Sequence, residues 1–115
     1  MVDSILSLST RGLRDWLIQR VTALIIGLYA IFIIGFIILH PQMQFDEWQS
    51  LFSFNITKIF SLLVLFSIIL HAWIGMWTVF TDYITSWRWR LFLEILVAIL
   101  FFGLLAWGAV VLWGF

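Results

Sequence analysis

The chain has 115 residues, of which 64% are hydrophobic and only 10% are charged. A soluble domain is about a quarter charged, and a chain this short has too small an interior to hide so many apolar residues. The composition therefore excludes a soluble single domain, and it also excludes intrinsic disorder. Six basic and six acidic residues cancel, which leaves no positive field for nucleic acid, and the absence of cysteine excludes disulfides, iron–sulfur clusters and thiolate metal sites.

Three uncharged runs are each long enough to cross a bilayer. They cover residues 21–39, 59–81 and 95–115. A membrane-spanning helix needs about 20 apolar residues, and the first run lacks the polar stripe that a surface helix of a soluble protein would show. The sequence therefore predicts an all-α integral membrane protein with three transmembrane helices in a single domain over residues 1–115. The predicted helices occupy about 17–39, 59–81 and 91–114.

Basic residues gather at one end of the predicted bundle. They are Arg11, Arg14, Arg20, Arg88 and Arg90, whereas the loop between the first two spans carries only Lys58. Because positive loops stay on the cytoplasmic side, this pattern predicts a cytoplasmic N-terminus and a C-terminus on the far side of the membrane.

The loop between the first and second spans contains three aromatic residues at helical spacing. They are Phe45, Trp48 and Phe52. A short helix with one aromatic face is typical of a segment that lies flat at the membrane interface. We therefore expect such a helix here.

Polar and small residues share one face of the second span. At 100° per residue they fall within an arc of about 80°; they are Ser67, His71, Gly75, Thr78 and Asp82. His71 lies about 16–18 Å from either boundary, near the midplane of the bilayer. Polar side chains at that depth face protein, a cofactor or water rather than lipid. Ser67 and Gly75 would leave room for a bulky group beside the imidazole.

Three interpretations of His71 remain open from the residues alone. The imidazole could hydrogen-bond to a neighbouring helix and hold the bundle together, ligate a haem iron, or relay protons. His40, the only other histidine, closes the first span beside Pro41 and is too shallow to provide a second axial ligand at the same depth. A haem with two histidine ligands would therefore need one of them from another chain.

Other polar residues have two interpretations each. Arg20 is either an orientation signal that reaches the headgroups or a partner for a carboxylate such as a haem propionate. Asp82 is a loop acid or a continuation of the polar face, and Tyr83 is a boundary aromatic or a hydrogen-bond donor to a quinone carbonyl. Glu94 is expected to pair with Arg90, four residues earlier on the same helix.

Two segments resemble a known family. The run HAWIGMWTVFTDY at 71–83 resembles part of the small hydrophobic membrane-anchor subunit (cytochrome b small subunit) of proteobacterial succinate dehydrogenase, complex II. The run RDWLIQRVTALIIGLY at 14–29 is similar to the N-terminal part of that subunit. The three-span plan and the length also agree, so the resemblance covers essentially the whole chain.

The resemblance implies a function and a set of site residues. In this family two subunits of three spans each form one haem-binding helix bundle, and each supplies one axial histidine to a shared haem b. His71 would be the haem-iron ligand of this chain and Arg20 would lie near the propionates, while Tyr83 would hydrogen-bond ubiquinone with Asp82 beside it. The partners would be the second anchor subunit, an iron–sulfur subunit and a flavoprotein subunit, in the bacterial inner membrane with the C-terminus in the periplasm. The chain itself would be non-catalytic.

Other classes remain as alternatives. A fumarate reductase anchor is one, although a midplane histidine followed by Asp82 and Tyr83 argues against it. A haem-free structural membrane protein is another. A transporter subunit finds little support, because the sequence shows neither an internal repeat nor an interrupted span.

Overall fold

The chain forms four helices and, within residues 2–114, no strand. The computed structural model describes these residues, with side chains from residue 12 onward. The helices are α1 (Val2–Leu39), α2 (Phe45–Ser53), α3 (Asn55–Tyr83) and α4 (Trp87–Trp113). Segments of α1, α3 and α4 are long and apolar enough to cross a membrane. The prediction of an all-α protein with three spanning helices is confirmed.

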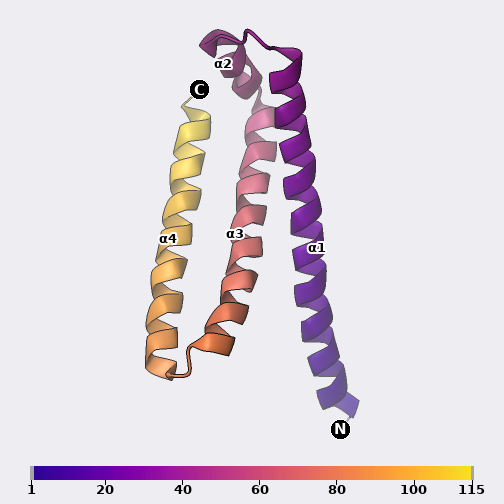
Figure 1. The fold of residues 1–115 in the computed structure, drawn as a ribbon, viewed down its shortest axis with the longest axis vertical. Coiled ribbons are helices and arrows are strands. Elements are labelled where there is room, and N and C mark those ends of the chain that lie inside the picture. The colour runs from indigo at the N-terminus through magenta and orange to yellow at the C-terminus, as the bar shows by residue number, and fades with distance from the viewer. Residues whose placement is uncertain (1, 115) are drawn as a thin grey trace.

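The helix α3 lies in the middle of the molecule. It packs against α1 on one side and α4 on the other, and α2 closes one end (Figure 1). The N-terminus and the α3–α4 turn lie at the opposite end. Arg88 and Arg90 lie in the first turn of α4, at this end, whereas Arg14 and Arg20 lie within α1 and Arg20 is near the middle of that helix. The side chain of Arg11 lies outside the described residues.

The helices extend beyond the apolar runs from which they were predicted. α1 begins at Val2 rather than near residue 17, and α4 begins at Trp87 rather than at 91. The reason is that polar residues such as serine, threonine and arginine continue a helix after it leaves the hydrocarbon. α1 ends at Leu39, as predicted, because the residue before Pro41 is disfavoured in the helical conformation.

The interior is more polar than the exterior. Among the described side chains, the buried apolar ones are Phe52, Val64 and Val97, and the buried polar ones are Thr22, Lys58, Ser61 and Ser67. Large apolar side chains point outward along the helices that can span the membrane. Lipid tails are as apolar as these side chains, so helix contacts in a bilayer rely on small residues and interhelical hydrogen bonds.

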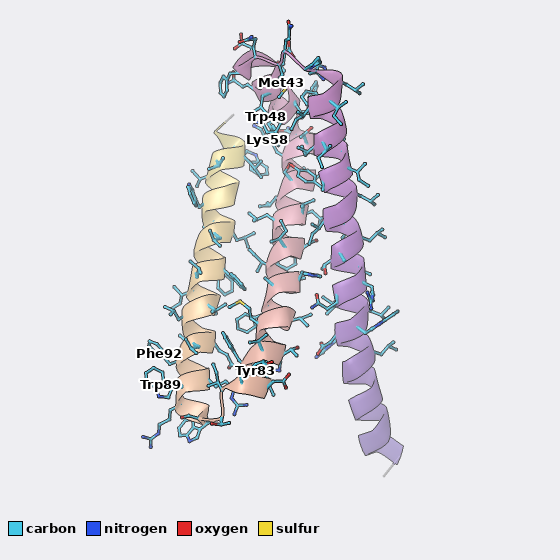
Figure 2. All side chains as sticks on the ribbon, in the orientation of Figure 1. Met43, Trp48, Lys58, Tyr83, Trp89 and Phe92 are labelled. Atoms are coloured by element: carbon cyan, nitrogen blue, oxygen red, sulfur yellow. The ribbon has the colours of Figure 1, made fainter. Side chains whose placement is uncertain are left out.

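The short helix α2 lies across the end of α3. Its Trp48 ring stands 4.8 Å from the Phe52 ring and 6.4 Å from Phe36 of α1, measured between ring centroids. Phe52 is buried, whereas Phe45 is exposed. At the same end the ammonium group of Lys58 lies 6.0 Å from the centroid of the Trp113 ring. Figure 2 shows Trp48 and Lys58 together at this end. The predicted short helix is therefore present.

Candidate functional site

The central histidine of α3 forms a hydrogen bond with α1. Oγ1 of Thr22 lies 3.1 Å from Nδ1 of His71. Thr22 is 4% exposed, and His71 is half-buried. The polar face predicted on α3 therefore meets α1 at this depth, and the contact is of the type that holds helices together in a membrane.

The Thr22 hydroxyl has further contacts within its own helix. Its oxygen lies 2.6 Å from the carbonyl oxygen of Ile18 and 3.2 Å from that of Gln19. A threonine hydroxyl in a helix commonly donates its proton to a carbonyl four residues earlier. Thr22 therefore stands between a backbone acceptor on α1 and the imidazole on α3.

A second hydrogen bond joins the same two helices nearer the α2 end. The Tyr29 hydroxyl lies 2.7 Å from the Ser61 hydroxyl, and Ser61 is buried. Thr22 and Tyr29 are seven residues apart, which is two helical turns, so they share one face of α1. These two bonds fix the position of α1 against α3.

The surroundings of His71 are uncrowded. Within the described part of the chain, Nε2 of His71 has no hydrogen-bond partner. Ser67, one turn away, donates its hydroxyl proton to the carbonyl of Leu63 at 3.0 Å and so does not compete for the imidazole. A Cβ added at Gly75 would have no atom within 4 Å. The Gly75 side is therefore open, whereas Ser67, the other small residue of the predicted space, is buried.

The rest of the polar face is exposed. Thr78 and Asp82 continue it beyond Gly75, and Thr78 donates its proton to the carbonyl of Ile74 at 3.1 Å. Tyr83 is 80% exposed, at the end of α3 near the arginines (Figure 2). Neither Asp82 nor the Tyr83 hydroxyl forms a hydrogen bond to the described side chains, so both are accessible from outside the chain.

A recess of about 600 Å³ lies between α1 and α3 on the arginine side of His71. Arg14 and Asp15 contribute its charged side chains, with a nitrogen–oxygen distance of 4.0 Å between them. Its lining is completed by Ile18, Leu70, Trp73, Ile74, Trp77 and Thr78. The recess is therefore mostly apolar, with its charged groups on the α1 side.

Arg20 does not share a site with His71 in this chain. Its guanidinium carbon lies 5.4 Å from the centroid of the Trp16 ring, and its side chain is exposed. Arg20 precedes Thr22 by two residues, which places the two side chains about 160° apart around α1. Within this chain Arg20 therefore does not contact His71, and its place near a haem propionate stays a prediction.

The predicted pair between Arg90 and Glu94 is wrong. No ion pair joins Arg90 and Glu94, both of which the structure describes. Instead, Oε1 of Glu94 is buried without a hydrogen-bond partner among the described residues. A pair at this spacing stabilises a helix by only about 0.2–0.5 kcal/mol, so it is too weak to be predicted reliably from spacing alone.

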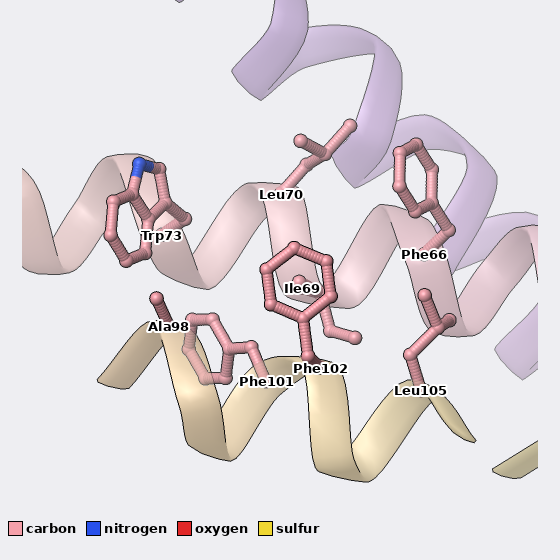
Figure 3. A pocket seen from close by; sticks show the side chains of 8 residues that line it. All are labelled: Phe66, Ile69, Leu70, Trp73, Ala98, Phe101, Phe102 and Leu105. Carbon is pink, nitrogen blue, oxygen red and sulfur yellow. The ribbon is translucent and has the colours of Figure 1, made fainter. Parts of the chain in front are cut away.

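The contact between α3 and α4 leaves an apolar cavity of about 290 Å³. Figure 3 shows aromatic and aliphatic side chains from both helices around it, among them Trp73 and Phe101, whose ring centroids are 6.3 Å apart. Its lining offers almost no polar surface and lies apart from the Thr22–His71 contact. It therefore has no group that could perform chemistry.

Sequence reasoning missed Thr22. One signal could have found it, because Thr22 and Tyr29 are the only residues in 21–39 with hydrogen-bonding side chains. Their spacing of seven places them on one helix face, where a partner helix with polar residues would be expected. The sequence alone does not show that this partner is α3, since that depends on how the helices pack.

Comparison with known proteins shows the family. No protein-family model matches the chain. The chain is 49% identical over 112 residues to the succinate dehydrogenase hydrophobic membrane anchor subunit of Coxiella burnetii (strain RSA 493 / Nine Mile phase I), covering 97% of both chains. With its three membrane-spanning helices, the chain belongs to the family of succinate dehydrogenase hydrophobic membrane anchor subunits.

Proposed function

We propose that this chain anchors a succinate:ubiquinone oxidoreductase in the bacterial inner membrane and shares a haem b with a second anchor subunit. The observation that carries this proposal is the state of His71. Its Nδ1 is bonded to Thr22, while Nε2 remains without a partner among the described residues, beside open space at Gly75. An imidazole held at one nitrogen and open at the other is the arrangement of a metal-ligating histidine.

The residues present fit one axial position of a haem and no more. A haem supplies its own four equatorial nitrogens, so the protein needs to offer only axial ligands. The described residues contain no cluster of three or more potential metal ligands, and His40 lies at the opposite end of α1. The second axial histidine would come from the partner anchor subunit. When bound, the iron would accept and release single electrons.

Tyr83 and Asp82 are proposed to form this chain's part of the ubiquinone site. Both are exposed at the arginine end of α3, where a lipid-soluble quinone could reach the Tyr83 hydroxyl from the membrane edge.

The iron–sulfur and flavoprotein subunits would dock at this same cytoplasmic end. Succinate oxidation would take place in the flavoprotein, so this chain would contribute no catalytic residue.

The experiment that tests the haem assignment compares the two histidines of the chain. The complex is purified with His71→Leu and, as the matched control, with His40→Leu. His40 stacks on Phe36 and lies 2.9 Å from the Phe36 carbonyl, far from the α1–α3 polar contact. We expect His71→Leu to lose the low-spin b-type optical spectrum and His40→Leu to retain it. An unchanged spectrum in His71→Leu would refute the assignment.

A haem-free structural role is the second candidate. The Thr22–His71 hydrogen bond favours it, because such a bond can hold two helices together without any cofactor. A colourless parent complex that loses stability with His71→Leu would support this candidate over the haem site.

A further inference from the structure

The Thr22 hydroxyl has a single proton, and its contacts decide where that proton goes. The carbonyl oxygen of Ile18 lies 2.6 Å from Oγ1 and can only accept a hydrogen bond. If the proton pointed to His71 instead, two oxygen lone pairs would face each other at this short distance. The hydroxyl therefore donates its proton to the carbonyl oxygen of Ile18. The lone pairs of Oγ1 remain available to accept a hydrogen bond from another group.

The direction of that bond fixes the tautomer of His71. Because Oγ1 of Thr22 accepts at 3.1 Å, Nδ1 of His71 must be the donor and must carry the hydrogen. A neutral imidazole has only one N–H group, so its lone pair is on Nε2. This nitrogen is the one without a partner among the described residues.

Burial strengthens this contact and fixes its geometry. Thr22 is 4% exposed, so water does not compete for its hydroxyl, and a hydrogen bond in a region of low polarity is electrostatically stronger. The Tyr29–Ser61 bond, two turns further along α1, joins the same two helices but does not include His71. The orientation of the imidazole is therefore set by α1 as well as by its own helix.

We propose that Thr22 is a positioning residue for the haem ligand. It holds His71 in the tautomer with hydrogen on Nδ1, so that Nε2 is presented to the iron. This inference rests on the proposed haem site. A hydrogen bond donated by the remote nitrogen makes the imidazole a more basic ligand, which favours ferric over ferrous iron and lowers the haem reduction potential.

The test uses three variants in the purified whole complex. Thr22→Val removes the hydroxyl but keeps the branched shape, Thr22→Ser restores the hydroxyl, and Tyr29→Phe removes the other hydrogen bond between α1 and α3. The haem potential is measured by optical redox titration, and the ferric g-values by low-temperature electron paramagnetic resonance. We expect Thr22→Val to raise the potential, so that at the parent midpoint the ferric-to-ferrous ratio falls about threefold. Thr22→Ser and Tyr29→Phe should keep the parent values.

Two results would overturn the role of Thr22 while leaving the haem site intact. One is a Thr22→Val complex with the potential and g-values of the parent. The other is an equal shift in Thr22→Val and Tyr29→Phe, which would mean that only helix packing matters. By contrast, a parent complex without haem, or a spectrum unaffected by His71→Leu, would refute the proposed function itself.

A measurement on the parent complex covers the case in which Thr22→Val fails to assemble. Histidine labelled with ¹⁵N only at Nε2 is incorporated, and electron–nuclear double resonance of the ferric haem identifies the nitrogens bound to iron. We expect both strongly coupled axial nitrogens to be labelled. The four porphyrin nitrogens carry no label, so the axial nitrogens are the ones that decide. An unlabelled axial nitrogen would place iron on Nδ1 and overturn the inference.

Discussion

Leu65 of α3 packs directly on Gly108 of α4, in the space that a side chain at position 108 would occupy. A leucine introduced at Gly108 would displace the Leu65 side chain and separate the two helices. We expect Gly108→Leu to destabilise the α3–α4 contact by about 1–3 kcal/mol, the usual cost of overpacking. The matched control is Gly103→Leu, because a Cβ at Gly103 has no atom within 4 Å. The measurement is the Tm of the purified complex, and equal losses in the two variants would contradict the prediction.

The Tyr29–Ser61 hydrogen bond should contribute to the stability of the α1–α3 contact. We expect a coupling energy of about 0.5–1.5 kcal/mol between the two hydroxyl groups, at the lower end if the bond behaves like an average one inside a membrane. The double-mutant cycle uses Tyr29→Phe, Ser61→Ala and the double variant, with the Tm of the complex as its measure. If the hydrogen bond stabilises the complex, the double variant loses less stability than the two single variants added together. Additive losses would show that the two hydroxyls act separately.

The Tyr83 hydroxyl should matter for quinone reduction and for nothing else. Tyr83→Phe keeps the ring at the membrane boundary, so it removes only the proposed hydrogen bond to a quinone carbonyl. The loss of about 1 kcal/mol corresponds to roughly fivefold weaker quinone binding. Succinate oxidation with an artificial acceptor that takes electrons before the quinone should stay normal, as should the haem content.

Tyr29→Phe is the control for this experiment, since Tyr29 is bonded to Ser61 inside the helix contact. It should reduce quinone like the parent. If Tyr83→Phe also matches the parent at every quinone concentration, Tyr83 is a boundary aromatic only.

The distribution of arginines predicts the orientation in the membrane. Arg88 and Arg90 lie in the first turn of α4, at the end opposite Lys58, and Arg14 and Arg20 lie in the N-terminal half of α1. Reporter domains fused after residue 88 should be active in the cytoplasm, and those fused after residue 115 should be active in the periplasm. The reverse pattern would move the proposed quinone site to the wrong side for an iron–sulfur partner in the cytoplasm.

The three spans could be predicted from the sequence because their signal is compositional. A run of about 20 uncharged apolar residues has few alternatives to a membrane helix. The ends were less predictable, since helical hydrogen bonding in α1 and α4 continues through polar residues outside the apolar run.

Only the α3 half of the candidate site could be predicted from the sequence. The position of His71 on a polar face follows from helical periodicity, which is a local property. Its pairing with Thr22 depends on the rotation and register of α1 against α3, and many residues far apart in sequence determine these. The error at Glu94 has a related reason, because its burial against the rest of the structure does not follow from the spacing to Arg90.

The scarcity of buried apolar side chains has a consequence for biogenesis. With only Phe52, Val64 and Val97 buried among the apolar side chains described, little apolar packing holds the three spans of this chain together. Each span is apolar enough to enter the bilayer alone, whereas a few polar contacts and close approaches decide how the inserted helices then meet. An orphan copy would stay firmly in the membrane while its helices remain free to separate. This polypeptide is thus held in the membrane by its own sequence, whereas the arrangement of its helices depends on assembly with the other subunits.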